Sequence, residues 1–422
     1  MKSFYNQFAN YIEKRFKVDA HYFLKGGFWL TAGQATSILF GLITTVLFAH
    51  YLSESDYGIY KYLTGLAAIL ASFSLTGLGQ AILQASAKKI YGFYRKTMVI
   101  SFKYNLTVAL FSLATAFYYW FNENMVLALG CLMIGILQPF INTFQFIPTY
   151  LLGRKQFKET TILQTVKMLI VSVVSIVTLF YTNNIIVLFF AYLFISLITN
   201  LVSHLVYNPK KEEIQEEIFA KYLNYAKHTS LRNIISVLVQ KADTVIIFTQ
   251  LGAVELAVYS IATVVPEQIK GSLKNLSNLL LPKYAAHSNL EQLKKSVPKR
   301  SLQLFVLLLL ITIIYLIVAP YLYQFIFPKY PDAIFYSQIS ALSLPAFILF
   351  IPFNILQAQL QEKVLYKLTL YSSLFQIIVV AVGILYFGLL GAIIARIGYR
   401  IFYMVIVYFY LYKSEFLKSD LN

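Results

Sequence analysis

Residues 301–327 read SLQLFVLLLLITIIYLIVAPYLYQFIF, a run without a charged side chain. A helix of about 20 residues crosses the hydrocarbon core of a bilayer, so this run is long enough to span a membrane. Comparable apolar stretches occupy residues 28–51, 58–84, 98–121, 125–151, 161–181, 185–207, 230–251, 254–281, 335–360, 366–388 and 391–412. An open sheet would leave its edge amides without partners in lipid. We therefore predict an all-α integral membrane protein with 12 transmembrane helices.

The composition supports a membrane protein over a soluble one. Of the 422 residues, 59% are hydrophobic and 13% are charged, which is too little polar material to cover several soluble cores. Cys131 is the single cysteine, so an internal disulfide and a cysteine-built zinc site are excluded, and we expect no cofactor or metal. The first 25 residues are polar and basic, unlike a cleavable signal peptide, and they predict a short helix on the membrane surface.

Lysine and arginine are distributed very unevenly between the two sides of the predicted spans. With the N-terminus inside, the seven inner segments hold 25 of them, and the six outer loops hold one, Lys329. The positive-inside rule therefore predicts that both termini are cytoplasmic. The net charge of +17 mostly reflects this topology, so we expect no nucleic-acid partner. The outer loops are too short to form an extracytoplasmic active site, and we do not expect an enzyme.

The longest inner connection, residues 208–229, divides the spans six and six. Its apolar residues recur at helical spacing and predict an amphipathic linker on the inner surface (Ile214, Ile218, Tyr222 and Tyr225). The predicted domains are thus an N-lobe (1–207), the linker (208–229) and a C-lobe (230–422). Residues 52–60 and 251–259 are alike, and prolines recur in the fourth and tenth spans, which indicates an ancestral duplication with parallel halves.

Several of these prolines lie inside predicted helices. A proline frees the carbonyl one turn earlier, and in lipid that carbonyl needs a partner such as cavity water or an ion. We predict helix breaks or bends at Pro139, Pro266 and Pro345, with Pro148 and Pro352 as further candidates. The alternative at each position is a static kink that packing fills.

Away from the loop ends, nine basic residues lie within the predicted spans, against two acids near the middle, Asp243 and Glu267. Lys103, Lys167 and Arg232 are near enough to the inner surface to extend to it, and Lys61 and Arg396 can reach the outer surface. The deep charges have two interpretations. One is an internal salt bridge, for example between Glu267 and Lys270. The other is a cavity for an anion such as phosphate or pyrophosphate, formed by Lys241, Lys270, Lys274, Arg400, Arg396 and Lys61.

Glu267 directly follows Pro266, which frees the carbonyl of Ala262 one turn away. A carboxylate beside a free carbonyl is suited to a proton or a sodium ion. Glu267 and Asp243 are therefore the candidates for coupling to an ion gradient of H⁺ or Na⁺. Polar side chains amid apolar runs could hydrogen-bond sugar hydroxyls (Gln34, Asn105, Gln138 and Gln145).

Residues 26–60, 240–247, 252–259, 281–284 and 327–330 resemble Wzx-type polysaccharide flippases. These proteins belong to the multidrug/oligosaccharidyl-lipid/polysaccharide (MOP) exporter superfamily. The resemblance implies two six-helix lobes around a central cavity, as in MATE transporters, and alternating access. It implies a monomer that moves undecaprenyl-diphosphate-linked oligosaccharides, such as O-antigen units, across the bacterial inner membrane. Membrane lipids and a polysaccharide polymerase are candidate partners. The family's acid in the seventh span matches Asp243.

Three other functions are compatible with parts of the pattern. A multidrug or organic-cation exporter of the same fold would need a cavity without surplus positive charge. A membrane enzyme acting on lipid-linked sugars, such as a polymerase or ligase, would need a larger outer loop. A non-transporting scaffold would leave the deep charges unexplained.

Overall fold

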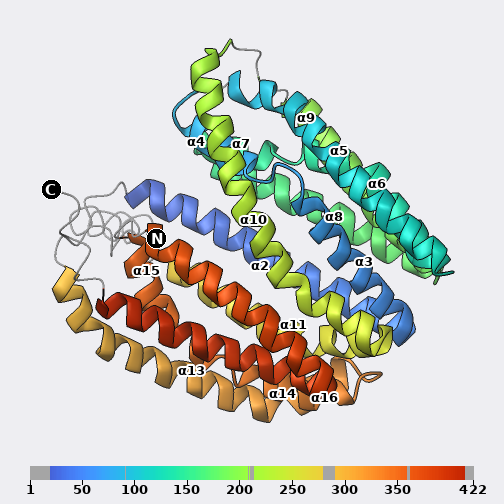
Figure 1. The fold of residues 1–422 in the computed structure, drawn as a ribbon, viewed down its shortest axis with the longest axis vertical. Helices are drawn as coiled ribbons and strands as arrows, with labels where there is room; N and C mark the ends of the chain where they lie inside the picture. Colours follow the sequence, from blue (N-terminus) through green and yellow to red (C-terminus); the bar gives the residue numbers. More distant parts are fainter. Residues whose placement is uncertain are drawn as a thin grey trace, which may run out of the picture. The chain divides into compact units, whose positions relative to one another are not determined.

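The computed structural model describes residues 20–90, 92–207, 209, 213–278, 290–358 and 362–413. The regular elements in these ranges are all helical, and Figure 1 shows their arrangement within each part of the chain. The surface helix predicted near the N-terminus lies mostly outside the described residues. The helices are α2 (Ala20–Tyr51), α3 (Glu54–Ser72), α4 (Leu78–Ala87), α5 (Gly92–Phe121), α6 (Met125–Phe144), α7 (Ile147–Gly153), α8 (Phe157–Tyr181), α9 (Ile185–Tyr207), α10 (Glu216–Leu251), α11 (Ala253–Asn278), α13 (Leu290–Ile326), α14 (Asp332–Ala341), η1 (Pro345–Leu349), α15 (Phe350–Ala358) and α16 (Glu362–Lys413).

Within the described ranges, nine helical segments are long and apolar enough to cross a membrane. The last of them, Leu370–Lys413, contains two of the predicted spans. Two further predicted spans, 58–84 and 254–281, are helical as well. The first is divided between α3 and α4, and the second is α11, which carries Glu255, Glu267 and Lys270.

The chain divides into two compact units, residues 1–241 (unit 1) and 242–422 (unit 2), with the boundary inside α10. The lobe limits at residues 207 and 230 stay a prediction. The first turns of α10, which fall in the predicted linker, pack against unit 1. Phe219, Tyr222 and Ala226 are buried there in one apolar cluster with Phe93 and Tyr94 of α5. The apolar face of this segment is therefore covered by protein.

The predicted single helix over residues 58–84 is wrong, because α3 ends at Ser72 and α4 begins at Leu78. Serine hydroxyls compete for the backbone carbonyls at this point. Ser72 Oγ donates to the carbonyl of Ile69 at 2.6 Å, and Ser74 Oγ donates to that of Ala71 at 2.7 Å. The helix therefore ends beside serine side chains, although hydrophobicity alone predicts that it continues.

The prolines occupy two kinds of position. Pro139 and Pro266 lie inside α6 and α11, which continue past them. Pro345 and Pro148 lie at the start of η1 and α7, where the missing N–H has no helical partner to lose. The fourth and tenth predicted spans are consequently both interrupted, one in each unit.

In unit 2, α16 contains the last two predicted spans, joined at Gly388. Gly388 has φ +58° and ψ −139°, a conformation that glycine adopts at little cost. The two arms then meet at Gly383 and Gly391, where a Cβ on Gly391 would lie 1.8 Å from the carbonyl oxygen of Gly383. Glycines therefore make both the turn and the close contact of its arms possible. Within this unit, α11 packs on α14, and α15 packs on α16.

Candidate functional site

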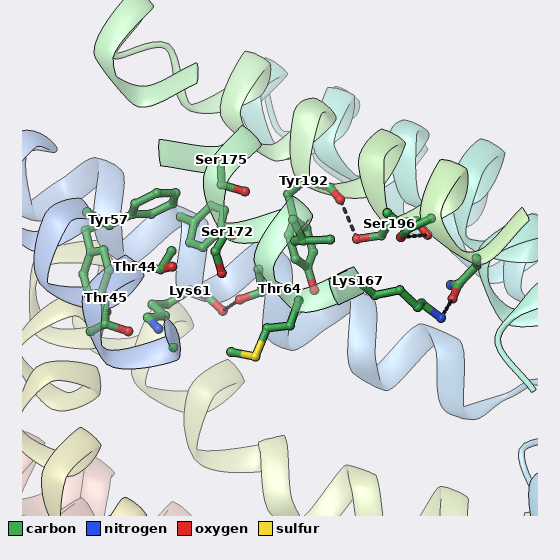
Figure 2. Close-up of a pocket in the computed structure, with 17 residues that line it drawn as sticks. Thr44, Thr45, Tyr57, Lys61, Thr64, Lys167, Ser172, Ser175, Tyr192 and Ser196 are labelled. Atoms are coloured by element: carbon green, nitrogen blue, oxygen red, sulfur yellow. Dashed lines mark hydrogen bonds between the residues drawn. The ribbon is translucent and has the colours of Figure 1, made fainter. Parts of the chain in front are cut away.

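Unit 1 contains a cavity of about 470 Å³ between α2, α3, α8 and α9 (Figure 2). The side chains that α3 contributes are spaced i, i+3, i+4 and i+7, which places them on one helix face (Tyr57, Tyr60, Lys61 and Thr64). The same rule applies to α9, where Tyr192, Ser196, Thr199 and Asn200 line the cavity. We call this the unit 1 cavity; its other lining residues are Gly41, Thr44, Thr45, Phe48, Lys167, Met168, Val171, Ser172 and Ser175.

Hydroxyl groups and tyrosine rings dominate the polar lining of the unit 1 cavity. Thr44 Oγ1 donates to the carbonyl of Phe40 at 2.9 Å, and Ser196 Oγ donates to that of Tyr192 at 2.6 Å. Their oxygens retain lone pairs that can accept hydrogen bonds from a ligand. The rings of Tyr60 and Tyr192 meet edge to face, with centroids 6.3 Å apart. Such a lining is suited to a ligand with many hydroxyl groups.

Two lysines give the unit 1 cavity a positive charge. Lys61 Nζ lies 5.1 Å from the ring centroid of Tyr57, and Lys167 Nζ donates a hydrogen bond to Oδ1 of Asn200. The cavity lining includes no carboxylate, and in the described part of the chain neither lysine forms an ion pair with an acid. The cavity therefore favours an anion.

Sequence reasoning found only part of this cavity. Lys61 was among the predicted anion ligands, and it does line the cavity. Lys167, which was expected to extend to the inner surface, also lines the cavity, and its reach to that surface stays a prediction. The tyrosines and Asn200 were missed, although the spacing of residues 57–64 carries the signal. None of the predicted sugar ligands Gln34, Asn105, Gln138 and Gln145 is among the lining residues.

Three of those predicted sugar ligands have partners elsewhere in unit 1, and one of them, Gln145, donates from Nε2 to the carbonyl of Asn142 at 3.1 Å. Asn105 is buried between α5 and α6, where its Oδ1 accepts from Asn142 Nδ2 at 3.1 Å and its Nδ2 donates to Thr143 Oγ1 at 3.2 Å. Gln138 Nε2 donates to Asn142 Oδ1 at 2.9 Å. These side chains therefore satisfy one another in the interior of the helix pair.

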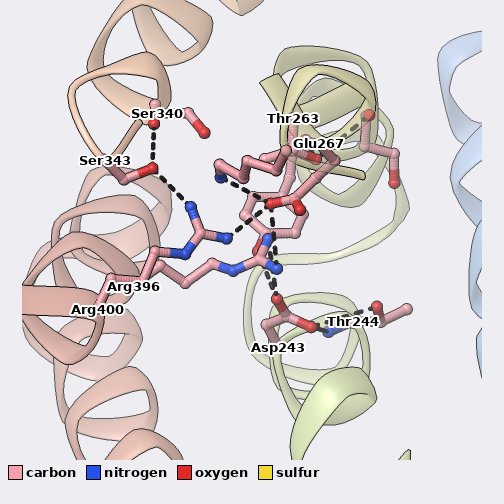
Figure 3. Close-up of polar contacts among 11 residues, drawn as sticks. Asp243, Thr244, Thr263, Glu267, Ser340, Ser343, Arg396 and Arg400 are labelled. Atoms are coloured by element: carbon pink, nitrogen blue, oxygen red, sulfur yellow. Dashed lines mark hydrogen bonds and ion pairs between the residues drawn. The ribbon is translucent and has the colours of Figure 1, made fainter. Parts of the chain in front are cut away.

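The deep charges of unit 2 form a second polar group, which we call the unit 2 charge cluster (Asp243, Glu267, Lys270, Arg396 and Arg400; Figure 3). Glu267 and Lys270 come from α11, and the arginines lie one turn apart on α16. Glu267 Oε1 lies 3.0 Å from Lys270 Nζ, 2.8 Å from Arg400 Nη2 and 3.5 Å from Arg396 Nη2. The internal salt bridge between Glu267 and Lys270, one of the two sequence interpretations, is present.

Asp243 occupies the other side of this cluster. Its Oδ2 accepts a hydrogen bond from Tyr259 at 2.5 Å and lies 3.5 Å from Arg396 Nη1, while its Oδ1 accepts from the backbone N–H of Thr244 at 2.8 Å. Arg396 Nη1 also donates to the Tyr259 hydroxyl at 2.7 Å. Both oxygens of Asp243 are thus occupied by protein donors.

Two other predicted anion ligands are not members of this cluster as defined above. Lys241 is half-buried on α10 and falls in unit 1. Lys274 belongs to the last part of α11, and its side chain lies outside the described residues. A role in substrate binding for these lysines, and for Lys270, Arg396 and Arg400, stays a prediction.

Solved structures of transporters share this fold. An outward-facing multidrug-resistance MATE transporter of the MOP superfamily superposes with a TM-score of 0.63 at 13% identity, over 92% of this chain and 95% of its own. An inward-facing MATE transporter gives 0.63 at 14% identity, over 90% and 94%. A MOP superfamily transporter from Pyrococcus furiosus, described as having a binding pocket of reverse polarity, gives 0.58 at 13% identity, over 93% and 95%.

No curated protein sequence matches the chain. A family model described as "Polysaccharide biosynthesis protein" matches residues 23–273, which is more than half of the chain. Together with the apolar helices, the fold makes this a multi-pass membrane protein with a MATE-like fold, as predicted. The chain belongs to the polysaccharide biosynthesis protein family.

Proposed function

We propose that this protein moves undecaprenyl-diphosphate-linked oligosaccharide units from the cytoplasmic to the outer leaflet of the bacterial inner membrane. The observation that carries the proposal is the unit 1 cavity, in which Lys61 and Lys167 lie among hydroxyl groups and tyrosine rings without a lining carboxylate. The match to a polysaccharide biosynthesis family supports a sugar as the cargo. The likeness to MATE transporters supports alternating access as the mechanism.

The chemistry of such a cargo fits the unit 1 cavity in two ways. A diphosphate is an anion, and ammonium groups bind phosphate as compact point charges. Sugar hydroxyls can donate to the oxygens of Thr44, Thr64 and Ser196. A volume of about 470 Å³ lies within the usual range of small-ligand pockets, about 300–1,000 Å³, and suits a phosphorylated headgroup. The isoprenoid tail is as apolar as lipid and can remain in the bilayer.

Coupling to H⁺ or Na⁺ is part of the proposal, with Asp243 and Glu267 as the candidate residues. Asp243 has both oxygens occupied by donors from the protein. The side chain of Glu267 is 38% exposed, and its contacts with Lys270, Arg396 and Arg400 are all made by Oε1. Glu267 is therefore the stronger candidate.

Depletion of the protein in its host tests the proposed cargo. We expect lipid-linked oligosaccharide to accumulate on the cytoplasmic leaflet and re-expression of the chain to clear it. An unchanged leaflet distribution would rule out the proposal. The alternative, an organic-cation exporter, predicts instead that the chain protects an efflux-deficient strain from cationic drugs. Two lysines in the unit 1 cavity disfavour that cargo.

A further inference from the structure

In the unit 2 charge cluster, three cationic groups converge on one oxygen atom. Lys270 Nζ, Arg400 Nη2 and Arg396 Nη2 lie 3.0, 2.8 and 3.5 Å from Glu267 Oε1. One ammonium and two guanidinium groups directed at the same point also suit the oxygens of a phosphate, which can accept one hydrogen bond from each. The carboxylate of Glu267 thus occupies the position where an anion would be bound.

The three cations have other contacts that would hold them in place without Glu267. Arg400 Nη1 donates to Ser343 Oγ at 2.5 Å, and Arg396 Nη1 donates to the Tyr259 hydroxyl at 2.7 Å. The ring of Phe347 in η1 lies 5.8 Å from both Lys270 Nζ and the guanidinium carbon of Arg400. The cationic site is therefore built from α11, α16 and the segment around η1, independently of the glutamate.

Glu267 is also the most accessible member of the cluster. Its side chain is 38% exposed, compared with 3% for Lys270, 13% for Arg400 and 20% for Arg396. With Glu267 in place, the cluster has two carboxylates and three cations. Without Glu267, Asp243 is the one carboxylate left among the cluster residues.

We propose that Glu267 is a displaceable counter-ion over a three-cation site, and that a phosphate or diphosphate group takes its place. The identity of this group as the cargo's diphosphate rests on the proposed function and means that the diphosphate contacts this cluster at a different stage of transport from its binding in the unit 1 cavity; the anion site itself does not depend on the proposed function. In this arrangement the glutamate keeps the buried cations compensated while no cargo is bound, because unpaired buried charges are costly. Displacement of Glu267 exchanges one set of charge-assisted hydrogen bonds for another.

Calorimetric binding of inorganic pyrophosphate to the purified full-length protein tests the proposal. The background carries Lys61→Gln and Lys167→Gln, which silences the unit 1 cavity. Adding Glu267→Gln should tighten pyrophosphate binding at least about tenfold, since the competing charge-assisted bonds to the cations are lost. Glu255→Gln is the matched control, with the same charge change in the first turn of α11. Equal affinities for Glu267→Gln and Glu255→Gln would overturn the proposal.

Two further arms separate the possible outcomes. If Glu267→Gln does not fold, Arg400→Gln is compared with the background alone, and it should weaken pyrophosphate binding at least about tenfold; unchanged binding contradicts the proposal. Undecaprenyl diphosphate in detergent should compete with pyrophosphate for the Glu267→Gln protein. A site that binds pyrophosphate but not this lipid would be an anion site for a soluble phosphate, and its link to the cargo would fail. Neither result depends on the leaflet assay, which tests the proposed function separately.

Discussion

Lys167 on α8 donates a hydrogen bond to Oδ1 of Asn200 on α9, inside the unit 1 cavity. The other end of the same amide, Nδ2, donates to the carbonyl of Ile141 at 3.4 Å. Ile141 lies in the last turn of α6, where the carbonyls begin to lack helical partners. One asparagine therefore ties a cavity lysine to the point where the fourth predicted span is interrupted.

Two substitutions of Asn200 should separate its contribution to stability from the effect of charge in the cavity. Asn200→Leu removes the partners of Lys167 and of the Ile141 carbonyl, so we expect unfolding in detergent to be easier by about 1–3 kcal/mol. Asn200→Asp keeps an acceptor for Lys167 but adds a negative charge, so it should retain more stability while weakening anion binding. Wild-type stability of Asn200→Leu in thermal unfolding would show that the link contributes nothing.

The contact between Asp243 and Arg396 should appear as a coupling energy in a double-mutant cycle. Arg396→Gln leaves Asp243 without its cation, and breaking a buried ion pair from one side can cost up to about 3–5 kcal/mol. Because both residues share this contact, Asp243→Asn combined with Arg396→Gln should destabilise less than the sum of the single changes, by about 0.5–3 kcal/mol. Additive effects on unfolding would contradict the pairing.

The arms of α16 supply a test of the fold with an internal control. Gly391→Ala places a Cβ against the carbonyl of Gly383 and should lower stability by about 1–3 kcal/mol, the usual cost of overpacking. Gly398 is on the same arm, and a Cβ there would meet nothing within 4 Å. Gly398→Ala should therefore be neutral or slightly stabilising, since alanine favours helix. Equal melting temperatures for the two variants would argue against the close contact at Gly391.

Hydrophobicity predicted the spans well because the membrane requires long apolar helices wherever the chain crosses it. It did not predict the interruption between Ser72 and Leu78. Side-chain hydroxyls donate to backbone carbonyls there, and these hydrogen bonds have no effect on the average hydropathy. Spans 366–388 and 391–412 were correctly separated, because their connection contains Gly388. Hydropathy averaged over a stretch of sequence therefore missed the helix end that depends on side-chain hydrogen bonds.

The site was harder to predict because it depends on contacts between distant positions. Glu267 and Arg400 are 133 residues apart, so the sequence could show that both are deep but not that they meet. The depth of Lys167 predicts that it can reach the inner surface, but it does not predict that the side chain donates to Asn200, 33 residues later. Local spacing carried a signal for the face formed by Tyr57, Tyr60, Lys61 and Thr64 and for the pair Glu267 and Lys270.

Ion coupling at Glu267 can be tested by transport under an imposed gradient. If Glu267 carries the coupling ion, Glu267→Gln should translocate lipid-linked oligosaccharide at a rate that no longer responds to a proton or sodium gradient. Glu255→Gln, on the same helix, should keep the wild-type response. Transport by Glu267→Gln at the full rate, with unaltered pH and sodium dependence, would exclude this residue as the coupling site.

The most direct test of the central claim is the translocation rate of undecaprenyl-diphosphate-linked oligosaccharide in proteoliposomes. Lys61→Gln with Lys167→Gln should slow translocation at least about tenfold, because the charge-assisted contacts to the diphosphate are lost. Lys103→Gln, which changes an exposed lysine of α5, should leave the rate unchanged. A double variant that translocates the lipid as fast as wild type would contradict the assignment of the unit 1 cavity to the cargo headgroup.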